Sequence, residues 1–535
     1  MVIGSYPSPQ LDGRGMPAQE FQEIFADGLA RFPDWVCGAW QFIQDILPHP
    51  SISLRRIKIC GHRVVLASVF PDNSDGDQLN GRSVLNKLGV VEVAHAPYPS
   101  LLPTYASPLG PILNCVKKAL SSPHLPLFIA GLASLAWIIQ LPALFSSGSI
   151  APYYHIDLDV YREGGRALLH GENLYAQSYV LDNGFSLPFT YPPFAAALFA
   201  MVSWLPLWPL SVLLIAASLG ALWVCLYAVI SRSCATERPG WWSSWALCAC
   251  MLTEPITETL SFGQVNLLLT AAVVVDCLLL SPRNQWRGVL TGIAIAIKLT
   301  PAVFLAVFFV RRDWRALATA VGAFVACGVV GHLASPASSA VYWTDTLRDS
   351  SRIGGLAYSG NQSLRGLLSR IVPEQASTLW ILGCIAIVAL LWWLMEHTSS
   401  QVELVLLASS AALLCSPVSW SHHFTWLCLA AVYLTAHRHW FLAALTWLTL
   451  LARGHWLVPH NEQLELAWSW WQQIPGNDYF LLVVFLVAVS CWLRLEPTDD
   501  GSVFRRLAPI GGGLSVQPTT GTLPKAQSAS DATAQ

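Results

Sequence analysis

The sequence predicts an all-α membrane protein that crosses the bilayer many times, and two observations support this fold class. Of its 535 residues, 54% are hydrophobic and only 12% are charged, which is not the balance of an ordinary water-soluble domain. Apolar runs recur between residues 125 and 495, and many approach the roughly 20 residues that one spanning helix needs. The net charge of −2 indicates no nucleic-acid partner, and the 13 cysteines show no metal-binding or redox spacing.

The chain divides into three parts. Residues 1–120 are mixed in polarity and never apolar for long enough to span, so we expect a cytoplasmic extension there. It could hold a helix or two at 20–47 and a strand pair at 52–69, or reflect an extended start of translation; no secretory signal is recognised. Residues 121–497 form the predicted membrane domain, and residues 498–535, rich in Gly, Ser, Thr and Pro, a disordered cytoplasmic tail.

The basic residues determine the predicted topology, because loops rich in Lys and Arg tend to stay in the cytoplasm. Both termini are then cytoplasmic, and residues 147–208 form a long first extracytoplasmic loop. This requires residues 192–207 to lie along the outer surface, and residues 288–310 to form a broken hairpin of two half-length helices that turns near Lys298. Pro301 fits the turn, since proline cannot continue the preceding helix. The total is about twelve helices, and the others are expected near 125–146, 209–231, 241–258, 265–281, 316–334, 376–395, 402–416, 423–437, 440–458 and 479–495.

Under this topology, six polar motifs collect at the extracytoplasmic face. Polar groups close to the hydrocarbon are costly and tend to be functional, so we expect them to form one site. The motifs lie at residues 156–161, 191–193, 262–266, 298, 360–363 and 416–423.

Asp157 is the first candidate for chemistry, since a carboxylate among aromatic residues at the edge of the bilayer suits a general base. Asp159 is as readily an ordinary loop carboxylate. The Asp-x-Asp pair could instead hold a divalent cation, but two carboxylates are an incomplete ligand set and we predict no metal. Lys298, in an apolar run, either reaches the interface as a snorkelling lysine or binds a phosphate held at the membrane surface.

His422 and His423 are adjacent, so a helix could turn only one of them toward a site. That histidine could orient a hydroxyl, stabilise a leaving phosphate or share a proton with Asp157, and a structural histidine is the alternative. The remaining candidates for substrate binding are each also explained as a helix cap, an interhelical bond, an interface residue or a solvated charge. They are Asp159, Tyr161, Tyr191, Gln264, Asn266, Asn361, Gln362, Arg365 and Trp420.

Taken in order, these motifs, together with Gly-Glu-Asn-Leu-Tyr at residues 171–175, resemble glycosyltransferase family 87 over residues 120–495. This is a group of polyprenol-phosphate-mannose-dependent α-mannosyltransferases of the GT-C superfamily. The resemblance implies a catalytic domain in the plasma membrane with an extracytoplasmic site, Asp157 as the base, and one of His422 and His423 as a second site residue. It also implies a polyprenyl-phosphate mannose donor, no further cofactor, and α-1,2 transfer to a lipid-anchored acceptor of the phosphatidylinositol mannoside or lipomannan type.

The chemistry expected is a single displacement with inversion at the anomeric carbon. Two other function classes stay open on the sequence. A transporter or flippase of polyprenyl-linked sugars could also use a broken helix at Lys298, although Asp276 and Lys298 are almost the only charges well inside an apolar run and no inverted repeat is evident. The other is a hydrolase that releases mannose to water.

Overall fold

The computed structural model describes residues 122, 124–141 and 153–495. The predicted extension at 1–120, with its expected helices and strand pair, and the predicted tail at 498–535 lie outside the described residues, as does the end of the span predicted at 125–146.

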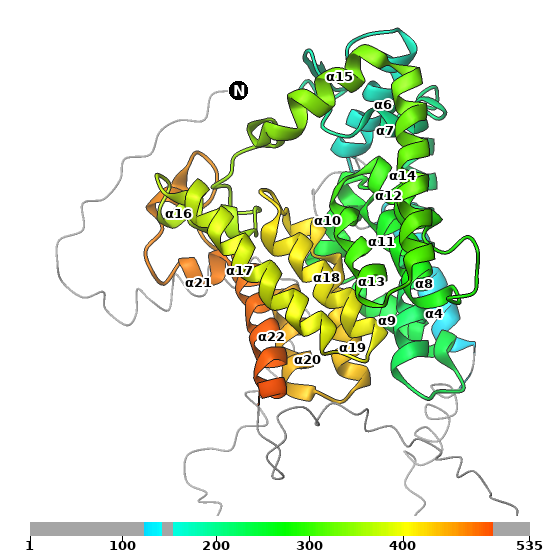
Figure 1. Cartoon of the computed structure of the whole chain (residues 1–535), viewed down its shortest axis with the longest axis vertical. Helices are drawn as coiled ribbons and strands as arrows, with labels where there is room; N and C mark the ends of the chain where they lie inside the picture. The colour runs from blue at the N-terminus through cyan, green and yellow to red at the C-terminus, as the bar shows by residue number, and fades with distance from the viewer. Residues whose placement is uncertain (1–121, 123, 142–152, 496–535) are drawn as a thin grey trace, which may run out of the picture. The chain divides into compact units, whose positions relative to one another are not determined.

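The prediction of an all-α polytopic membrane protein is confirmed. Four of the described helices are long and apolar enough to cross a membrane: α8 (Leu207–Ser233), α14 (Trp314–Ala334), α17 (Ala376–Glu396) and α22 (Asp478–Leu495). Shorter apolar helices pack among them and share one large buried core (Figure 1). These are α4 (Leu125–Ile138), α9 (Pro239–Cys250), α18 (Gln401–Cys415), α19 (Thr425–Ala436) and α20 (Trp440–Ala452). We call this set of helices, with the two broken elements described next, the bundle.

One broken element is a helix pair that bends by 118°. Its arms are α10 (Glu254–Phe262) and α11 (Asn266–Val274), and α11 continues into the π-helical segment η1 (Val275–Leu279). Gly263 ends α10 in the left-handed region, with φ of 72°. A Cβ on Gly263 would lie 2.8 Å from the Cβ of Leu158, so both the backbone angle and the close packing favour glycine. The prediction of one span at 241–258 is wrong for a separate reason. Helix α9 ends at Cys250 and α10 begins at Glu254, so the chain is broken within that range.

The second broken element is the one predicted at 288–310. Helix α12 (Val289–Ile297) ends just before Lys298, and the chain continues through η2 (Thr300–Phe304) into α13 (Leu305–Val310). Arg287 before α12 pairs with Asp313 after α13 at 3.1 Å, so the two ends of the segment meet. Asp276 accepts a hydrogen bond from the backbone N–H of Thr291 at 2.7 Å and so caps the first turn of α12. This buried carboxylate is thus part of the helix packing.

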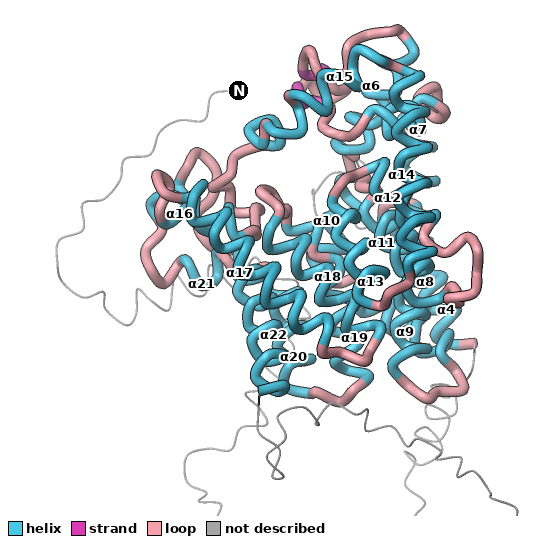
Figure 2. Tube along the Cα trace, viewed as in Figure 1, coloured by secondary structure: helices cyan, strands magenta, loops and turns pink. Residues whose placement is uncertain are grey.

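A smaller group of elements has its own buried core at one end of the bundle. We call it the cap layer. It contains α6 (Ile156–Leu169), the antiparallel strands β1 (Ser178–Val180) and β2 (Ser186–Pro188), α7 (Pro193–Ala200) and α15 (Pro336–Thr344). Figure 2 shows these short helices and strands joined by long loops beyond the ends of α10 and α12. The surface helix predicted at 192–207 is confined to α7. Helix α6 was not predicted from the sequence. Its Asp157 and Asp159 lie in the first turn, where the helix dipole stabilises a negative charge.

Short elements complete the chain. Between α15 and α17 lie η3 (Thr346–Arg348), η4 (Ser350–Ile353) and α16 (Leu364–Ile371), and η5 (Ser421–His423) precedes α19. The connection from α20 to α22 contains η6 (Gly454–Trp456), η7 (Leu464–Ala467) and α21 (Gln473–Gly476). The helix predicted at 440–458 accordingly ends earlier than expected, at Ala452.

Candidate active site

A cavity of about 670 Å³ lies between the cap layer and the bundle. Asp157 of α6, Tyr342 of α15, Lys298 at the break after α12, and His423 of η5 all line it. Its size suits a small-molecule site. Of the sequence candidates, the cavity brings together Asp157, Tyr191, Gln264, Lys298, Trp420 and His423.

Asp157 stands on the first turn of α6, opposite Gln264 at the bend after α10. Gln264 forms a side-chain hydrogen bond with the Asp157 carboxylate, and the Lys298 ammonium attracts it. Burial nevertheless raises the pKa of Asp157 to about 6, since burial disfavours the charged form by more than the hydrogen bond and the ammonium favour it. A carboxylate with this pKa is ionised at neutral pH and can still accept a proton, as a general base must.

Two tyrosines fix the orientation of Gln264. The hydroxyl of Tyr161 donates to Gln264 Oε1 at 2.9 Å and lies 2.8 Å from the hydroxyl of Tyr191. Because Oε1 is engaged in this way, the amide nitrogen of Gln264 is directed to Asp157. Tyr161 is 1% exposed and does not line the cavity, so it supports the site from behind, while Tyr191 lines the cavity itself.

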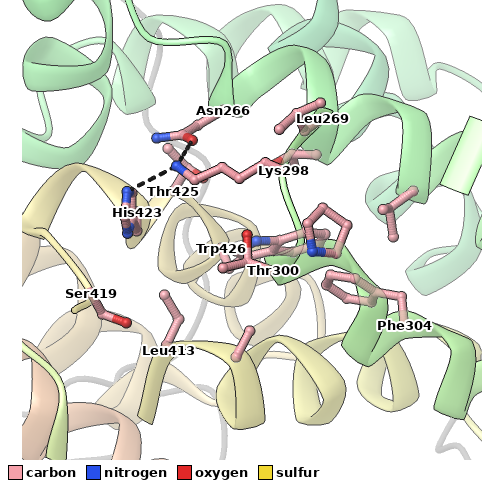
Figure 3. Close-up of a pocket in the computed structure, with 14 residues that line it drawn as sticks. Asn266, Leu269, Lys298, Thr300, Phe304, Leu413, Ser419, His423, Thr425 and Trp426 are labelled. Carbon is pink, nitrogen blue, oxygen red and sulfur yellow. Dashed lines mark hydrogen bonds between the residues drawn. The ribbon is translucent and has the colours of Figure 1, made fainter. Parts of the chain in front are cut away.

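Lys298 lies in a compact polar group with Asn266 and His423 (Figure 3). Its Nζ donates to Asn266 Oδ1 at 3.0 Å and lies 3.1 Å from His423 Nε2. Burial and the nearby ammonium lower the pKa of His423, so its ring is neutral and Nε2 can accept from Lys298. The Asn266 amide nitrogen is buried and has no hydrogen-bond partner among the described residues. An unsatisfied donor beside a cation is suited to an oxyanion ligand.

A second, smaller cavity of about 60 Å³ adjoins this group. It shares Lys298, Thr300 and His423 with the larger cavity and continues between apolar side chains such as Phe304 and Trp426 (Figure 3). The polar group therefore has an apolar surface on one side and the main cavity on the other.

The two adjacent histidines have different surroundings. His423 lines both cavities, whereas His422 lines neither and is 6% exposed. The His422 ring packs edge-on against Phe262, and its carbonyl accepts from the Thr259 hydroxyl at 3.0 Å. The structure thus places His423, and not His422, in the cavity, which fits the expectation that only one of them faces the site.

Asp159 is turned away from the cavity, although it is two residues from Asp157. It is fully buried and pairs with Arg162 at 2.8 Å, and Arg162 in turn pairs with Asp182 at 2.6 Å. The Tyr154 hydroxyl also donates to it. These bonds hold α6 to the loop between the two strands, so the two aspartates do not converge on one ion. The described residues contain no group of three or more His, Cys, Asp or Glu side chains suited to a metal.

Asn361, Gln362 and Arg365 do not line the cavity either. The side chain of Asn361 accepts from the Ser419 N–H at 3.0 Å, and Gln362 donates to the Gly476 carbonyl at 2.8 Å. Both amides are fully buried and support the loop that carries Trp420. Arg365 donates to Ser377 and lies over the ring of Trp380.

Sequence reasoning missed two features near the site. Arg352 and Asp349, in the segment between α15 and α16, line the cavity. Glu254 and His455 lie behind η5 in a buried ionic network, 3.5 Å apart. A charge just inside an apolar run was the available signal for Glu254, whereas nothing local distinguishes Arg352 from the other charges of its segment.

Comparison with known proteins identifies the family. The model of glycosyltransferase family 87 matches residues 189–417. A polyprenol-phosphate-mannose-dependent alpha-(1-2)-phosphatidylinositol mannoside mannosyltransferase of Mycolicibacterium smegmatis is 36% identical over 399 residues, which cover 67% of this chain and 89% of that protein. The chain belongs to glycosyltransferase family 87. The prediction of a glycosyltransferase is thereby confirmed.

Two further relatives of this family 87 glycosyltransferase have similar names. The protein of the same name from Mycobacterium tuberculosis is 33% identical over 387 residues, covering 66% of this chain and 89% of its own length. A pentamannoside mannosyltransferase of M. smegmatis is 34% identical over 398 residues, covering 70% and 92%. No solved structure matches the chain. The family match includes Tyr191, Gln264 and Lys298 but not Asp157 or His423, so the family model by itself assigns neither residue.

Proposed function

We propose that this family 87 enzyme transfers a mannosyl residue from polyprenyl-phosphate mannose to a phosphatidylinositol mannoside or a similar lipid-linked mannoside, forming an α-1,2 linkage with inversion. The names of the relatives support this donor and acceptor class. The observation that carries the mechanism is the arrangement of Asp157, Lys298 and His423 around one cavity.

In the proposed reaction, the Asp157 carboxylate takes the proton from an acceptor hydroxyl while that oxygen attacks the anomeric carbon of the donor mannose. The bond from the anomeric carbon to the phosphate oxygen breaks, and the electron pair leaves with the polyprenyl phosphate. Attack opposite the leaving group converts a β-linked donor into an α-linked product. Phosphate leaves readily, so no strong general acid is required.

Lys298 is the group that would stabilise the departing phosphate. Its Nζ is held by Asn266 and His423, so it is already in position before the negative charge develops. Because its ring is neutral and its Nε2 accepts from Lys298, His423 brings no positive charge of its own to the phosphate. We therefore assign the main charge stabilisation to Lys298 and a positioning role to His423.

The site is proposed to face away from the cytoplasm. Arg311 and Arg494 donate to the carbonyl groups of Ser399 and His397, at the loop between α17 and α18. This loop adjoins the first residues of α14, whereas the far end of α14 leads into α15 and the cavity. The rule that basic loops stay in the cytoplasm then supports an extracytoplasmic cavity.

Replacement of the base tests the mechanism most directly. Asp157→Asn is expected to lower mannosyl transfer by about 10²- to 10⁴-fold, because the amide cannot accept the proton. Since burial disfavours the ionised carboxylate, the variant should fold with equal or greater stability above pH 6. Transfer of radiolabelled mannose and thermal unfolding would be measured with Glu172→Gln, an exposed charge change just after α6, as the control. Near-normal turnover by Asp157→Asn would exclude Asp157 as the base.

A labelling experiment tests the topology separately. An impermeant maleimide applied to intact cells is expected to label a cysteine placed at Glu172, in the cap layer, and not one placed at Arg283, between η1 and α12. Both positions are exposed in the structure. The parent protein supplies the baseline for its own cysteines. The reverse pattern would place the cavity on the cytoplasmic side.

A further inference from the structure

The cavity contains a second cation that the proposed mechanism does not use. Arg352 lines it from η4. With Lys298 it makes up the positively charged lining of the cavity, and Asp157 and Asp349 make up the negatively charged lining. The two positive and two negative side chains give the lining no net charge. A bound anion is therefore stabilised chiefly by direct contact with one of the two cations.

The contacts of Arg352 leave part of its guanidinium unused. One terminal nitrogen donates to the carbonyl of Tyr175 at 3.0 Å. Its Nε is shielded from solvent and has no hydrogen-bond partner among the described residues. A guanidinium has five N–H donors in a rigid fork, so one carbonyl does not satisfy it. A buried donor without a partner is costly, and this favours a ligand that completes the set.

A chain of tyrosines connects this cation to the first. The Tyr175 hydroxyl donates to the carbonyl of Tyr191 at 2.7 Å, and the ring of Tyr191 lies under the Lys298 ammonium at 5.5 Å. The carbonyl that anchors Arg352 and the ring beneath Lys298 thus belong to one packed unit of the cap layer. Both cations therefore line the same cavity and contact the same unit of the cap layer.

We propose that Arg352 binds a phosphate oxyanion of one of the two lipid substrates. This inference rests on the proposed function, because both proposed substrates carry a phosphate: a monoester-linked sugar phosphate in the donor and a phosphodiester in the acceptor. Arginine suits either, since its fork matches two phosphate oxygens. Arg352 is a binding residue in this proposal and takes no part in proton transfer.

The neighbouring segment provides a matched control. Arg348 lies four residues earlier in η3, is exposed and does not line the cavity. A long-range effect of charge in this segment would affect Arg348→Gln and Arg352→Gln alike. Loss of the hydrogen bond from Arg352 to Tyr175 would lower thermal stability and would not be confined to the KM of one phosphate-bearing substrate. A direct phosphate contact would affect only Arg352→Gln.

The test uses the full-length enzyme in detergent, with Arg352→Gln, Arg352→Lys and Arg348→Gln compared to the parent. KM is measured for polyprenyl-phosphate mannose, for an anionic phosphatidylinositol mannoside and for an uncharged alkyl mannoside acceptor. We expect Arg352→Gln to raise one KM by about 10- to 100-fold, the effect of losing a hydrogen bond to a charged group. Arg352→Lys should recover part of the loss, and Arg348→Gln should match the parent.

The pattern identifies the phosphate. A higher KM for the donor with every acceptor supports the proposal and assigns the donor phosphate. A higher KM for the anionic acceptor alone, with the uncharged acceptor unaffected, supports it and assigns the acceptor phosphate. Unchanged KM values, or equal losses in Arg348→Gln, overturn it.

A failure of the proposed function is recognised separately, because the parent enzyme would then transfer no mannose from polyprenyl-phosphate mannose. In that case, binding of polyprenyl phosphate and of phosphatidylinositol mannoside is followed by tryptophan fluorescence. Weaker binding of either lipid by Arg352→Gln alone still supports the phosphate site, and equal binding of both overturns it.

Discussion

Two buried groups of ionisable side chains lie on either side of η5, and they differ in how their charges are paired. Behind η5, Glu254 accepts from Tyr479 at 2.9 Å and from Trp456 at 3.2 Å, and it pairs with His455. His455 also pairs with Asp478 at 2.9 Å, and its carboxylate partners raise its pKa to about 9. We call this group the rear network.

In front of η5, the polar groups of the cavity are incompletely paired. Asn266 and Arg352 each retain a buried donor without a partner among the described residues, and burial raises the pKa of Asp157. The comparison suggests that the rear network supports the fold, whereas the polar groups of the cavity are available to a ligand. In the rear network each charge has a fixed ion-pair partner, although His455 Nε2 lies 3.5 Å from Glu254, too far for a good hydrogen bond. Fixed ion pairs hold a fold together, whereas unused donors at a cavity indicate a ligand.

The largest expected effect concerns the rear network. Glu254→Ala should lower the free energy of unfolding by about 3–5 kcal/mol, because it leaves buried His455 without one partner. Thermal unfolding in detergent measures this, with Glu172→Ala as the exposed control. If Glu254→Ala folds normally but shows a raised KM for the donor, the rear network belongs to the substrate site and the distinction fails.

Next in size is the loss of the cation in front of η5. Lys298→Met should lower turnover by about 10²-fold, or roughly 2.7 kcal/mol, because the leaving phosphate loses its stabilising charge. Its thermal stability should not fall, since the change removes a buried ammonium from an apolar run. Arg365→Met, a cation outside the cavity, serves as the control. Equal stability losses in both variants, with normal turnover, would make Lys298 structural.

The smallest effect sharpens the electrostatic part of the comparison. Because the folded pKa of Asp157 is raised to about 6, kcat/KM should fall about tenfold per pH unit below that value as the carboxylate is protonated. Gln264→Ala removes a hydrogen bond that lowers this pKa, so its acid limb should move to higher pH. A pH–rate profile from pH 5 to 8 measures both. An identical acid limb in the two proteins would show that Gln264 does not lower the pKa of the catalytic carboxylate.

Much of the architecture could be predicted from the sequence, since it follows from the length of apolar runs. The break near Lys298 was predictable because arginines flank the run at both ends and Pro301 lies in it. The 118° bend at Gly263 was not, because apolar composition is the same in a straight and a bent helix. The sharp turn depends on the packing of Gly263 against Leu158, about a hundred residues away in the sequence.

The candidate site was also predicted only in part, because the sequence shows which residues are unusual but not which of them meet. Asp157, Lys298 and the pair His422 and His423 were identifiable because a charged or ionisable group at the edge of an apolar run is costly. The sequence did not decide which histidine faces the cavity. Asn361 and Gln362 were predicted as sugar ligands, but the structure uses them to hold the loop before η5, and an amide looks the same in both roles. Arg352 was missed, since only the fold brings its segment against the cavity.

The volume of the cavity limits how much of each lipid the enzyme can enclose. A space of about 670 Å³ accommodates the reacting sugars and a phosphate, but not two long hydrocarbon chains. If the proposed donor and acceptor are its substrates, most of both lipids would stay in the surrounding bilayer during catalysis. Encounter of the substrates would then depend on lateral diffusion within the membrane, and the product would be released directly into the bilayer.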